Sequence, residues 1–492
     1  MHLSIIIIYT LCLTVIFVYS LVQLQLIFKY RKSRKTKIMA SPWMNLEGEL
    51  PFVTVQLPVF NEKYVARRLL DCISKLEYPK DKWEIQVLDD STDETRTILF
   101  QKVLSLEKEG FNITYHHRTD RKGYKAGALK EGLKFAKGEF IALFDADFLP
   151  HPSFFKTTLP YFQEGNIGMV QTKWGHLNKE YSLLTRLQAF GLNAHFTVEQ
   201  RGRNEADYFI NFNGTAGIWR KNCIIDAGDW KSDTLTEDLD LSYRAQLKGW
   251  KFKYLEDVES PAELPVEITS FKSQQFRWTK GAAETAKKLL PKVWSADIGK
   301  LHKTHSIFHL LNSTIFICVL VSAILSVPML WIKHQDPAYK YYFHFASFFL
   351  VSLVILAFLY WETMAHEYKS RKSKFKMFFK NFPLFLSVMM GLSLHNSIAA
   401  IEGFLGIKTP FVRTPKFDIV GLKAKGRENV YVSSRFSFLN IIEIILAAYF
   451  VFGIYLGIAL EDYALIFYHF MLVLGFGLIV FYTIRHSNVF GK

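Results

Sequence analysis

The stretch EFIALFDAD, residues 139–147, joins an apolar run to a pair of carboxylates. Its first six residues are rich in aromatic and branched side chains, which is typical of a buried β-strand. Alternate residues of an extended strand point to the same face, so we expect Asp145 and Asp147 to point the same way. Two such carboxylates repel each other unless a cation lies between them, and Mg²⁺ or Mn²⁺ carrying a diphosphate meets that need. The alternative is two solvated aspartates in a turn.

Four further runs have the composition of strands: PFVTVQLPVF (51–60), WEIQVLDD (83–90), NITYHH (112–117) and IGMVQTKW (167–174). Helical patterns separate the first strands at residues 62–77, 93–108 and 124–137. Strands that alternate with helices predict a mostly parallel sheet, and ligands of such sheets bind at the carboxyl ends of the strands. Asp89 and Asp90 end the second strand, so the sequence predicts an α/β domain that binds a nucleotide.

A basic segment, RTDRKGYKAGALKEG (118–132), lies between these two acidic strand ends. Its cations cluster where we expect a helix to begin, near Ala126, and a helix N-terminus together with cations favours a phosphate. Lys125 is the candidate for that contact. A solvated basic loop is the alternative that this segment alone leaves open.

The stretch LTEDLDLSYRAQ (235–246) predicts a helix that begins near Thr236. Thr236 is suited to cap that helix, and Glu237 and Asp238 fall in its first turn, where acidic side chains are favoured. Capping alone would explain these residues. Sugar transfer with inversion also needs a carboxylate that takes a proton from a hydroxyl group, and Asp238 is the candidate for that base.

The stretch QQFRW (274–278) places Gln274, Arg277 and Trp278 on one face of a helix. Arg277 is suited to hold a departing diphosphate, and the ring of Trp278 offers an apolar face on which a sugar stacks. The alternative is an amphipathic helix that lies on a membrane with a belt of Trp and Arg, and the two interpretations are compatible.

The composition is segregated along the chain of 492 residues, which is 50% hydrophobic and carries a formal charge of +15. Residues 3–28 and 305–485 are largely apolar, whereas residues 38–304 have the composition of a soluble α/β protein. Membrane proteins collect Lys and Arg in cytoplasmic loops, so the basic balance indicates membrane topology rather than a nucleic-acid partner. The 4 cysteines form no CxxC motif, and neither a disulfide framework nor a zinc site is predicted.

Five segments are long and apolar enough to cross a bilayer: 3–28, 305–332, 341–363, 436–459 and 464–484. The first is followed at once by KYRKSRKTK (29–37), which indicates a stop-transfer anchor, whereas a cleaved signal peptide would have a basic start and a small-residue cleavage site. The basic stretches 366–380 and 408–435 are both expected in the cytoplasm. The segment 381–406 between them is therefore predicted to be an interfacial or re-entrant helix, and a sixth crossing is the alternative.

Six motifs occur in the order seen in one enzyme family: DDSTDET, KAGALKEG, FDADF, FNGTAGIWR, TEDLDLSYRA and QQFRWTKG. Over residues 45–290 the chain resembles the family 2 inverting glycosyltransferases of the cellulose-synthase-like type, above all the plant mannan and xyloglucan-backbone synthases and their bacterial relatives. The later membrane arrangement is similar only loosely. The resemblance implies a GT-A-like domain over 38–304, between an anchor at 1–37 and an α-helical transmembrane region at 305–492.

The resemblance also implies roles for the residues that match the family on the donor side. Asp89 and Asp90 would contact the base and ribose of a nucleotide sugar. Asp145 and Asp147 would serve its diphosphate and a Mg²⁺ or Mn²⁺ ion, next to Lys125.

On the acceptor side, the resemblance makes Asp238 the general base, with Glu237 beside it among the substrate-binding residues. Gln274, Arg277 and Trp278 would bind the acceptor end and the diphosphate.

Two further stretches bear on which branch of the family the chain is similar to. FVRTPKF (411–417) is similar to the basic gating loop that lies over the site in these synthases, and Thr414 and Lys416 match that loop approximately. Cellulose synthases commonly have His after the DxD motif, where this chain has Phe148. That departure weakens the case for cellulose and fits the mannan-synthase-like branch.

Two functions stay open from the sequence. The first is a processive synthase that adds β-linked hexose from UDP-glucose or GDP-mannose to a growing polysaccharide, and the number of crossings and the gating-like loop favour it. The second is a glycolipid synthase that transfers glucose to ceramide or diacylglycerol. A transporter or receptor with a degenerate nucleotide fold would have lost an acidic motif, and all are intact.

The expected partners are the nucleotide sugar, a glycan or lipid acceptor and membrane lipids, with no nucleic acid. The expected location is the plasma membrane in a bacterium or the Golgi membrane in a plant, with the catalytic domain in the cytosol.

Overall fold

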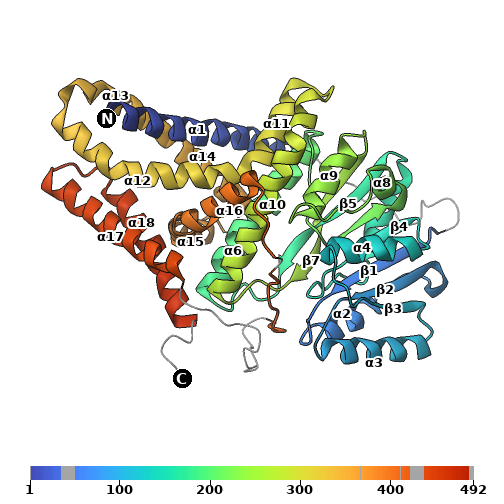
Figure 1. Ribbon diagram of the computed structural model, residues 1–492. Helices are drawn as coiled ribbons and strands as arrows, with labels where there is room; N and C mark the ends of the chain where they lie inside the picture. Colours follow the sequence, from blue (N-terminus) through green and yellow to red (C-terminus); the bar gives the residue numbers. More distant parts are fainter. Residues whose placement is uncertain are drawn as a thin grey trace.

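The computed structural model describes residues 2–34, 50–365, 367–368, 370–410, 412–420 and 437–486. Within these residues, an α/β region lies on one side of the molecule and a group of long helices on the other (Figure 1). Both ends of the described chain belong to the group of long helices. Residues 411 and 421–435 of the basic stretch predicted at 408–435 lie outside the described residues.

A seven-stranded sheet forms the centre of the α/β region, in the order β3-β2-β1-β4-β6-β5-β7. Neighbouring strands are parallel except where β6 lies antiparallel between β4 and β5. The predicted mostly parallel sheet is therefore confirmed, and the five predicted strands are β1 to β5. The strands are β1 (Val53–Val59), β2 (Trp83–Asp89), β3 (Ile113–His117), β4 (Phe140–Leu143), β5 (Ile167–His176), β6 (Gly217–Arg220) and β7 (Lys251–Ala262).

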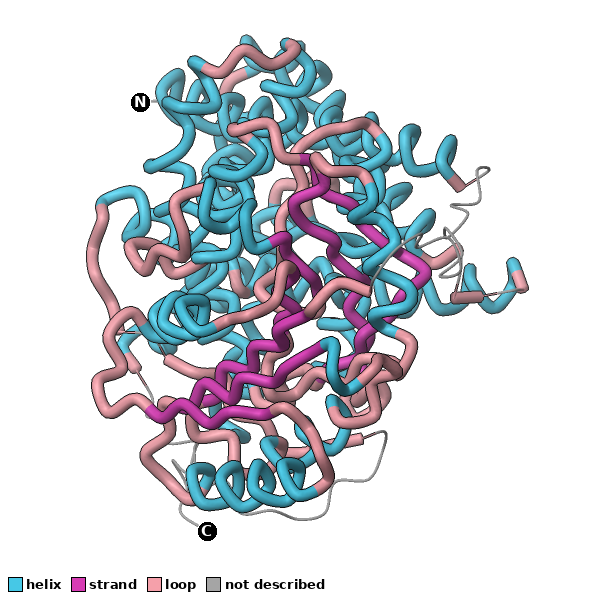
Figure 2. The backbone as a smooth tube through the Cα atoms, turned by 90° about the vertical axis from the view of Figure 1, so that its right-hand side faces the viewer, coloured by secondary structure: helices cyan, strands magenta, loops and turns pink. Residues whose placement is uncertain are grey.

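Helices cover both faces of the sheet, which Figure 2 shows in magenta. On one face, Val55 packs in a buried cluster with Leu69 and Leu99. On the other face, Ile141 packs in a second cluster with Leu129. Strand β2 is buried along its whole length, as expected for a parallel strand that is covered on both sides. The helices that supply these clusters are α2 (Ala66–Ile73), α3 (Thr95–Lys108), α5 (Phe154–Thr158), α4 (Tyr124–Phe135), α8 (Lys221–Asp226) and α9 (Glu237–Gln246).

Asp145 and Asp147 lie in a turn after β4 rather than in the strand itself. Strand β4 ends at Leu143, and the backbone nitrogen of Phe148 donates to the carbonyl of Asp145 at 3.0 Å. The prediction that the two carboxylates alternate along an extended strand was therefore wrong. The turn begins at the carboxyl end of β4, so both residues still lie at the edge of the sheet where ligands bind.

Five helical segments of the described chain are long and apolar enough to cross a membrane. They correspond to the five predicted spans, by length and composition. They are α1 (His2–Ser33), α11 with α12 (Lys300–Gln335), α13 with α14 (Lys340–Thr363), α17 (Phe438–Ala459) and α18 (Ile466–His486).

The segment predicted as one interfacial or re-entrant helix over 381–406 consists of two helices. Helix α15 (Arg371–Gly391) begins inside the basic stretch 366–380, and α16 (Ser393–Leu405) follows after a bend of 49°. As one unit the pair is also long and apolar enough to cross, so the interfacial or re-entrant placement stays a prediction.

Helix α10 (Ile268–Ser295) joins the two halves of the molecule (Figure 1). It packs along α16 on one side and against the turn before α9 on the other. A β-carbon at Gly281 would lie 2.5 Å from Cγ2 of Thr236 and 2.9 Å from the backbone nitrogen of the same residue. Glycine at position 281 thus lets the helix approach the acidic turn closely.

Candidate active site

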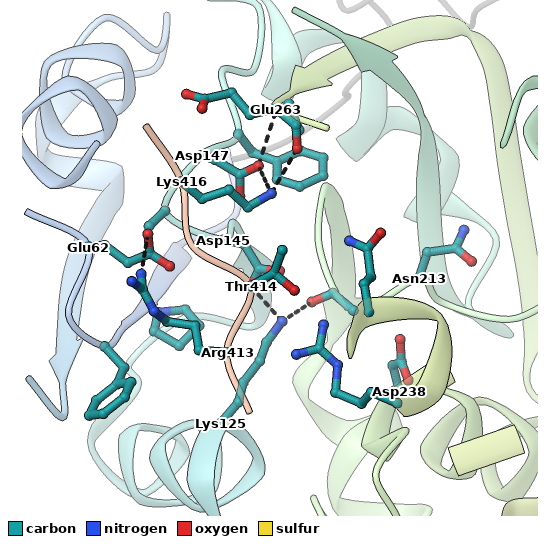
Figure 3. A pocket seen from close by; sticks show the side chains of 18 of the residues that line it. Glu62, Lys125, Asp145, Asp147, Asn213, Asp238, Glu263, Arg413, Thr414 and Lys416 are labelled. Atoms are coloured by element: carbon teal, nitrogen blue, oxygen red, sulfur yellow. Dashed lines mark hydrogen bonds and ion pairs between the residues drawn. The ribbon is translucent and has the colours of Figure 1, made fainter. Parts of the chain in front are cut away.

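The predicted site residues come together around one cavity at the carboxyl ends of β1, β2 and β4. Four of them, Lys125, Asp145, Asp147 and Asp238, are labelled in Figure 3. All but Asp89 line this cavity, which we call the donor cavity: Asp90, Lys125, Asp145, Asp147, Glu237, Asp238, Gln274, Arg277 and Trp278.

Asp89 and Asp90 have different surroundings although they are neighbours. Asp89 is fully buried behind the cavity and accepts hydrogen bonds from the hydroxyl of Tyr115 at 2.6 Å and the backbone of Ser91 at 2.9 Å. Asp90 lines the cavity, where Arg118 donates to its two oxygens at 2.8 and 2.6 Å. The carboxylate of Asp90 therefore faces the cavity, whereas the carboxylate of Asp89 holds the end of the strand in place.

Lys125 lies in the first turn of α4 and points into the donor cavity. Its ammonium donates to Asp145 and, at 2.9 Å, to the carbonyl of Gly214. Burial opposes the charge, but Asp145, Glu237 and Asp238 outweigh it and raise the pKa of Lys125. A permanent cation thus lies among three carboxylates.

Asp147 is buried and contacts a segment that is distant in sequence. Lys416 donates to Oδ2 of Asp147 at 2.6 Å and to the carbonyl of Glu263 at 2.8 Å. Nearby, Arg413 lies 2.7 Å from Glu62, and Figure 3 shows both basic side chains turned toward their carboxylates. Residues 412–418, here called the lid segment, are therefore held over the cavity by ion pairs.

Asp238 lies half-buried in the first turn of α9, next to Glu237. Burial and the negative charge of Glu237 raise the pKa of Asp238 to about 7. The predicted capping role of Thr236 was wrong, because its side chain makes no capping hydrogen bond and lies 3.2 Å from the hydroxyl of Thr285 in α10. The acidic turn is therefore fixed by contact with α10.

Gln274, Arg277 and Trp278 project from α10, as the helical spacing predicts. Burial lowers the pKa of Arg277, although Glu237, Asp145 and Asp238 favour its charge. The rings of Trp278 and Trp174 lie 6.4 Å apart and tilted by 53°. This face of α10 sets a cation and an aromatic surface opposite the carboxylates.

A second cavity continues from the donor cavity between the long helices, and we call it the helix cavity. Gln274 and Trp278 line both cavities, as does Leu192. Its other lining residues come from α1, α6 (Leu183–Ala194), the turn His195–Glu199, α10, the turn Leu311–Ser313, α12 (Thr314–Gln335), α14 (Val351–Thr363) and α15. They include polar side chains, namely Gln23, Gln188, His195, Glu199, Gln275, Thr279 and Asn312.

Several cavity residues were not predicted as site residues. Glu62 follows β1, and the strand-end argument that selected Asp90 would have selected it too. Burial raises the pKa of Glu62 to about 7 in spite of the nearby Arg413. Glu263 follows β7, a strand that was not predicted, and Asn213 belongs to the FNGT loop.

The α/β region matches a known protein family. Residues 51–281 match the family described as glycosyltransferase like family 2. These residues form a glycosyltransferase family 2 domain. The glycosyltransferase domain includes all ten of the predicted site residues, from Asp89 to Trp278.

Curated relatives of the glycosyltransferase domain are plant enzymes. Glucomannan 4-beta-mannosyltransferase 1 of Oryza sativa subsp. japonica is 40% identical over 302 residues, which is 56% of this chain and 56% of the relative. Glucomannan 4-beta-mannosyltransferase 1 of Cyamopsis tetragonoloba is 37% identical over 327 residues, 63% of this chain and 62% of the relative. The chain therefore spans little more than half the length of these relatives.

A solved structure shares the fold. The mannosyltransferase from Pyrobaculum calidifontis in complex with GDP-Man and Mn²⁺ matches with a TM-score of 0.57 over 82% of this chain and 100% of that chain. The sequence identity is 16%, so this likeness shows the fold alone. It agrees with the predicted GT-A-like α/β domain.

Proposed function

We propose that this chain is a membrane-embedded inverting hexosyltransferase that extends a β-linked glycan, with GDP-mannose as the donor. The observation that carries the proposal is the donor cavity, where Asp145, Asp147 and Asp238 face Arg277 and Trp278. Such a set supplies a diphosphate site, a base and a sugar-stacking ring at one place. A receptor or transporter would not need all three.

The donor sugar is proposed from the relatives. Two glucomannan 4-beta-mannosyltransferases are similar to this chain over 56% and 63% of its length. The fold neighbour was solved with GDP-Man. The nucleotide would lie at the ends of β1 and β2, where Phe60, Asp90 and Arg121 line the donor cavity.

A divalent cation fits the carboxylates of the donor cavity. Among the described residues, no three His, Cys, Asp or Glu side chains gather into a metal cluster. Mg²⁺ and Mn²⁺ sites of nucleotide enzymes need only one or two carboxylates, because phosphates supply the other ligands. Asp145 and Asp147 would hold the ion, which when bound supplies positive charge against the diphosphate. Both carboxylates are next to lysine ammonium groups, so they already lie where cations are stable.

The reaction that we propose is a single displacement at the anomeric carbon. Asp238 takes the proton from the acceptor hydroxyl as the new bond to the anomeric carbon forms, and the bond to the nucleoside diphosphate breaks. Arg277 and Lys125 stabilise the charge that develops on the leaving diphosphate. Attack opposite to the leaving group converts an α-linked donor into a β-linkage.

The helix cavity favours a glycan acceptor over a lipid acceptor. It begins at Trp278 and carries amide, imidazole and carboxylate groups between helices that are otherwise apolar. Sugar hydroxyls can hydrogen-bond to such groups, whereas an acyl chain makes no use of them. A growing chain would extend from the donor cavity into this space, with the glycosyltransferase domain on the cytosolic side. The membrane would be that of the Golgi in a plant or the plasma membrane in a bacterium.

The test is to incubate the purified protein in lipid vesicles with radiolabelled GDP-mannose, GDP-glucose and UDP-glucose, with and without Mn²⁺. We expect a water-insoluble or high-mass product from GDP-mannose that a β-mannanase digests. A product that partitions into organic solvent would support the glycolipid alternative instead. No transfer from any of the three donors would contradict the proposal.

A further inference from the structure

A π-helical turn, His195–Glu199, interrupts the helical run between α6 and α7 (Gln200–Glu205). Turns of this kind are rare and occur frequently at functional sites. This turn lies between the two cavities, because His195 and Glu199 line the helix cavity and His195 contacts Asn213, which lines the donor cavity. None of the motifs in the sequence includes these two residues.

The imidazole of His195 is held between two side chains. Its Nδ1 lies 3.1 Å from Oε2 of Glu199, and its Nε2 lies 3.2 Å from Oδ1 of Asn213. Burial opposes ionisation of Glu199, but the hydrogen bond from His195 and the charge of Arg203 hold the pKa of Glu199 at about 2. The carboxylate of Glu199 therefore keeps its charge and fixes the orientation of the ring.

Asn213 connects His195 and Glu199 to the surroundings of the proposed base, Asp238. It lines the donor cavity and directly precedes Gly214. A β-carbon at Gly214 would lie 3.1 Å from Oδ2 of Asp238 and 3.5 Å from Nζ of Lys125. Gly214 has φ of 80°, a backbone conformation that residues with a side chain rarely adopt and that glycine adopts readily. Figure 3 shows Asn213 and Asp238 on the same side of the cavity.

We propose that His195 is a positioning residue that, held by Glu199, sets the side chain of Asn213 and the loop at 213–215. In this arrangement the loop presents the acceptor hydroxyl to Asp238. The inference rests on the proposed function and adds the residues that govern the acceptor side. His195 hydrogen-bonds to Glu199 and Asn213, and the loop reaches the donor side where Lys125 donates to the carbonyl of Gly214 and the backbone nitrogen of Asp145 donates to Thr215. We therefore expect the loss of His195 to weaken acceptor binding more than donor binding.

The experiment uses the full chain in lipid with GDP-mannose and β-mannooligosaccharides of defined length. The variants are His195→Ala, Glu199→Ala and Glu199→Gln, and the control is His116→Ala, which changes a half-buried histidine of β3. Three quantities are measured for each: the acceptor KM, the donor Kd, and the ratio of free mannose to mannose transferred. Thermal unfolding of each variant reports whether it is folded.

We expect His195→Ala to raise the acceptor KM by about tenfold, the equivalent of 1.4 kcal/mol, and to raise the share of donor that is hydrolysed. The donor Kd changes less than the acceptor KM. Glu199→Ala acts in the same direction, and Glu199→Gln restores part of the loss because its amide oxygen still accepts from Nδ1. The control matches the unchanged protein.

An unchanged acceptor KM and hydrolysis ratio in both His195→Ala and Glu199→Ala would overturn the inference alone. So would an equal loss of donor binding, since that indicates a general loss of structure. If His195→Ala does not fold, the acceptor KM and the hydrolysis ratio of Glu199→Ala, compared with those of Glu199→Gln, test the inference in its place. An unchanged protein that transfers no hexose would overturn the proposed function and this inference together.

Discussion

Lys416 donates a hydrogen bond to Oδ2 of Asp147 at 2.6 Å, although 269 positions separate the two residues in the sequence. A cation from the lid segment thus occupies the carboxylate that we propose for a divalent metal. The lid segment and the metal compete for the same oxygen, because each offers positive charge to it.

The first prediction follows from this competition. Lys416→Met removes the competing ammonium, so we expect it to lower the Mn²⁺ concentration that half-saturates donor binding several-fold. Asp147→Ala should raise that concentration or abolish the Mn²⁺ dependence. Titration calorimetry with GDP and Mn²⁺ measures both.

A suitable control is Lys156→Met, which breaks an equally short but exposed ion pair with Glu77. It should leave the Mn²⁺ titration as it is. Weaker Mn²⁺ binding in Lys416→Met would mean that the lid segment cooperates with the metal instead of competing with it.

The second prediction concerns the proposed base. Asp238→Asn keeps the shape of the side chain but cannot take a proton, so turnover should fall by about 10²–10⁴-fold while donor binding stays within a factor of two. Steady-state kinetics and donor titration separate the two effects. Asp207→Asn is the control, because that carboxylate is 81% exposed and remote from the cavity. Near-normal turnover of Asp238→Asn would show that Asp238 is not the general base.

The third prediction is the pH dependence. The pKa of Asp238 is raised to about 7 by burial and by Glu237, so the carboxylate is largely protonated at pH 6 and largely ionised at pH 8. A base acts only when ionised. We therefore expect kcat/KM to rise with pH through about 7 and to level off above it. Glu237→Gln removes the neighbouring charge and should move the midpoint to lower pH.

The fourth prediction tests the contact between α10 and the acidic turn. Gly281→Ala places a methyl group 2.5 Å from Thr236, so the turn or the helix must shift. Overpacking of this kind costs about 1–3 kcal/mol, and we expect a lower Tm together with a large loss of turnover. Gly299→Ala is the control, since a β-carbon there meets nothing within 4 Å. Equal Tm and turnover for both variants would show that the contact is loose.

The fifth prediction concerns the attachment of α10 to the long helices. Lys272 of α10 lies 2.6 Å from Glu443 of α17, with side chains that are 11% and 1% exposed. Lys272→Met leaves a buried carboxylate without its cation, which costs about 3–5 kcal/mol in comparable cases. The double change Lys272→Met with Glu443→Leu should recover most of the stability.

Thermal unfolding in detergent measures both variants. Lys134→Met, which removes an exposed partner of Glu131, should leave Tm unchanged. If the double variant were less stable than the single one, the charges themselves would be required.

The strands that were predicted are the runs rich in Val, Ile and aromatic residues. Strand β2 is buried at every position, and its composition shows this directly. Strand β6 has four residues, and β7 has the sequence KFKYLEDVESPA, in which charged and apolar residues mix. Their pairing is set by β4 and β5, which are distant in sequence, so local composition does not reveal them.

Site residues could be predicted from the sequence where they directly follow a strand or share one face of a helix. Asp145 and Asp147 come after β4, and Arg277 and Trp278 share one face of α10, so their positions follow from local rules. The pairing of Glu62 with Arg413 joins residues from opposite ends of the chain, and no local pattern contains it. The same holds for His195 and Asn213, whose contact depends on a π-helical turn.

Helix α10 carries two of the three side chains that line both cavities, Gln274 and Trp278. If nucleotide and saccharide bind as proposed, this shared helix would make the affinity for each depend on whether the other is bound. By thermodynamic linkage, a bound saccharide would change the affinity for nucleotide by the same factor by which a bound nucleotide changes the affinity for saccharide. The time for which the protein retains the glycan between successive additions would thus depend on how long the nucleoside diphosphate remains bound.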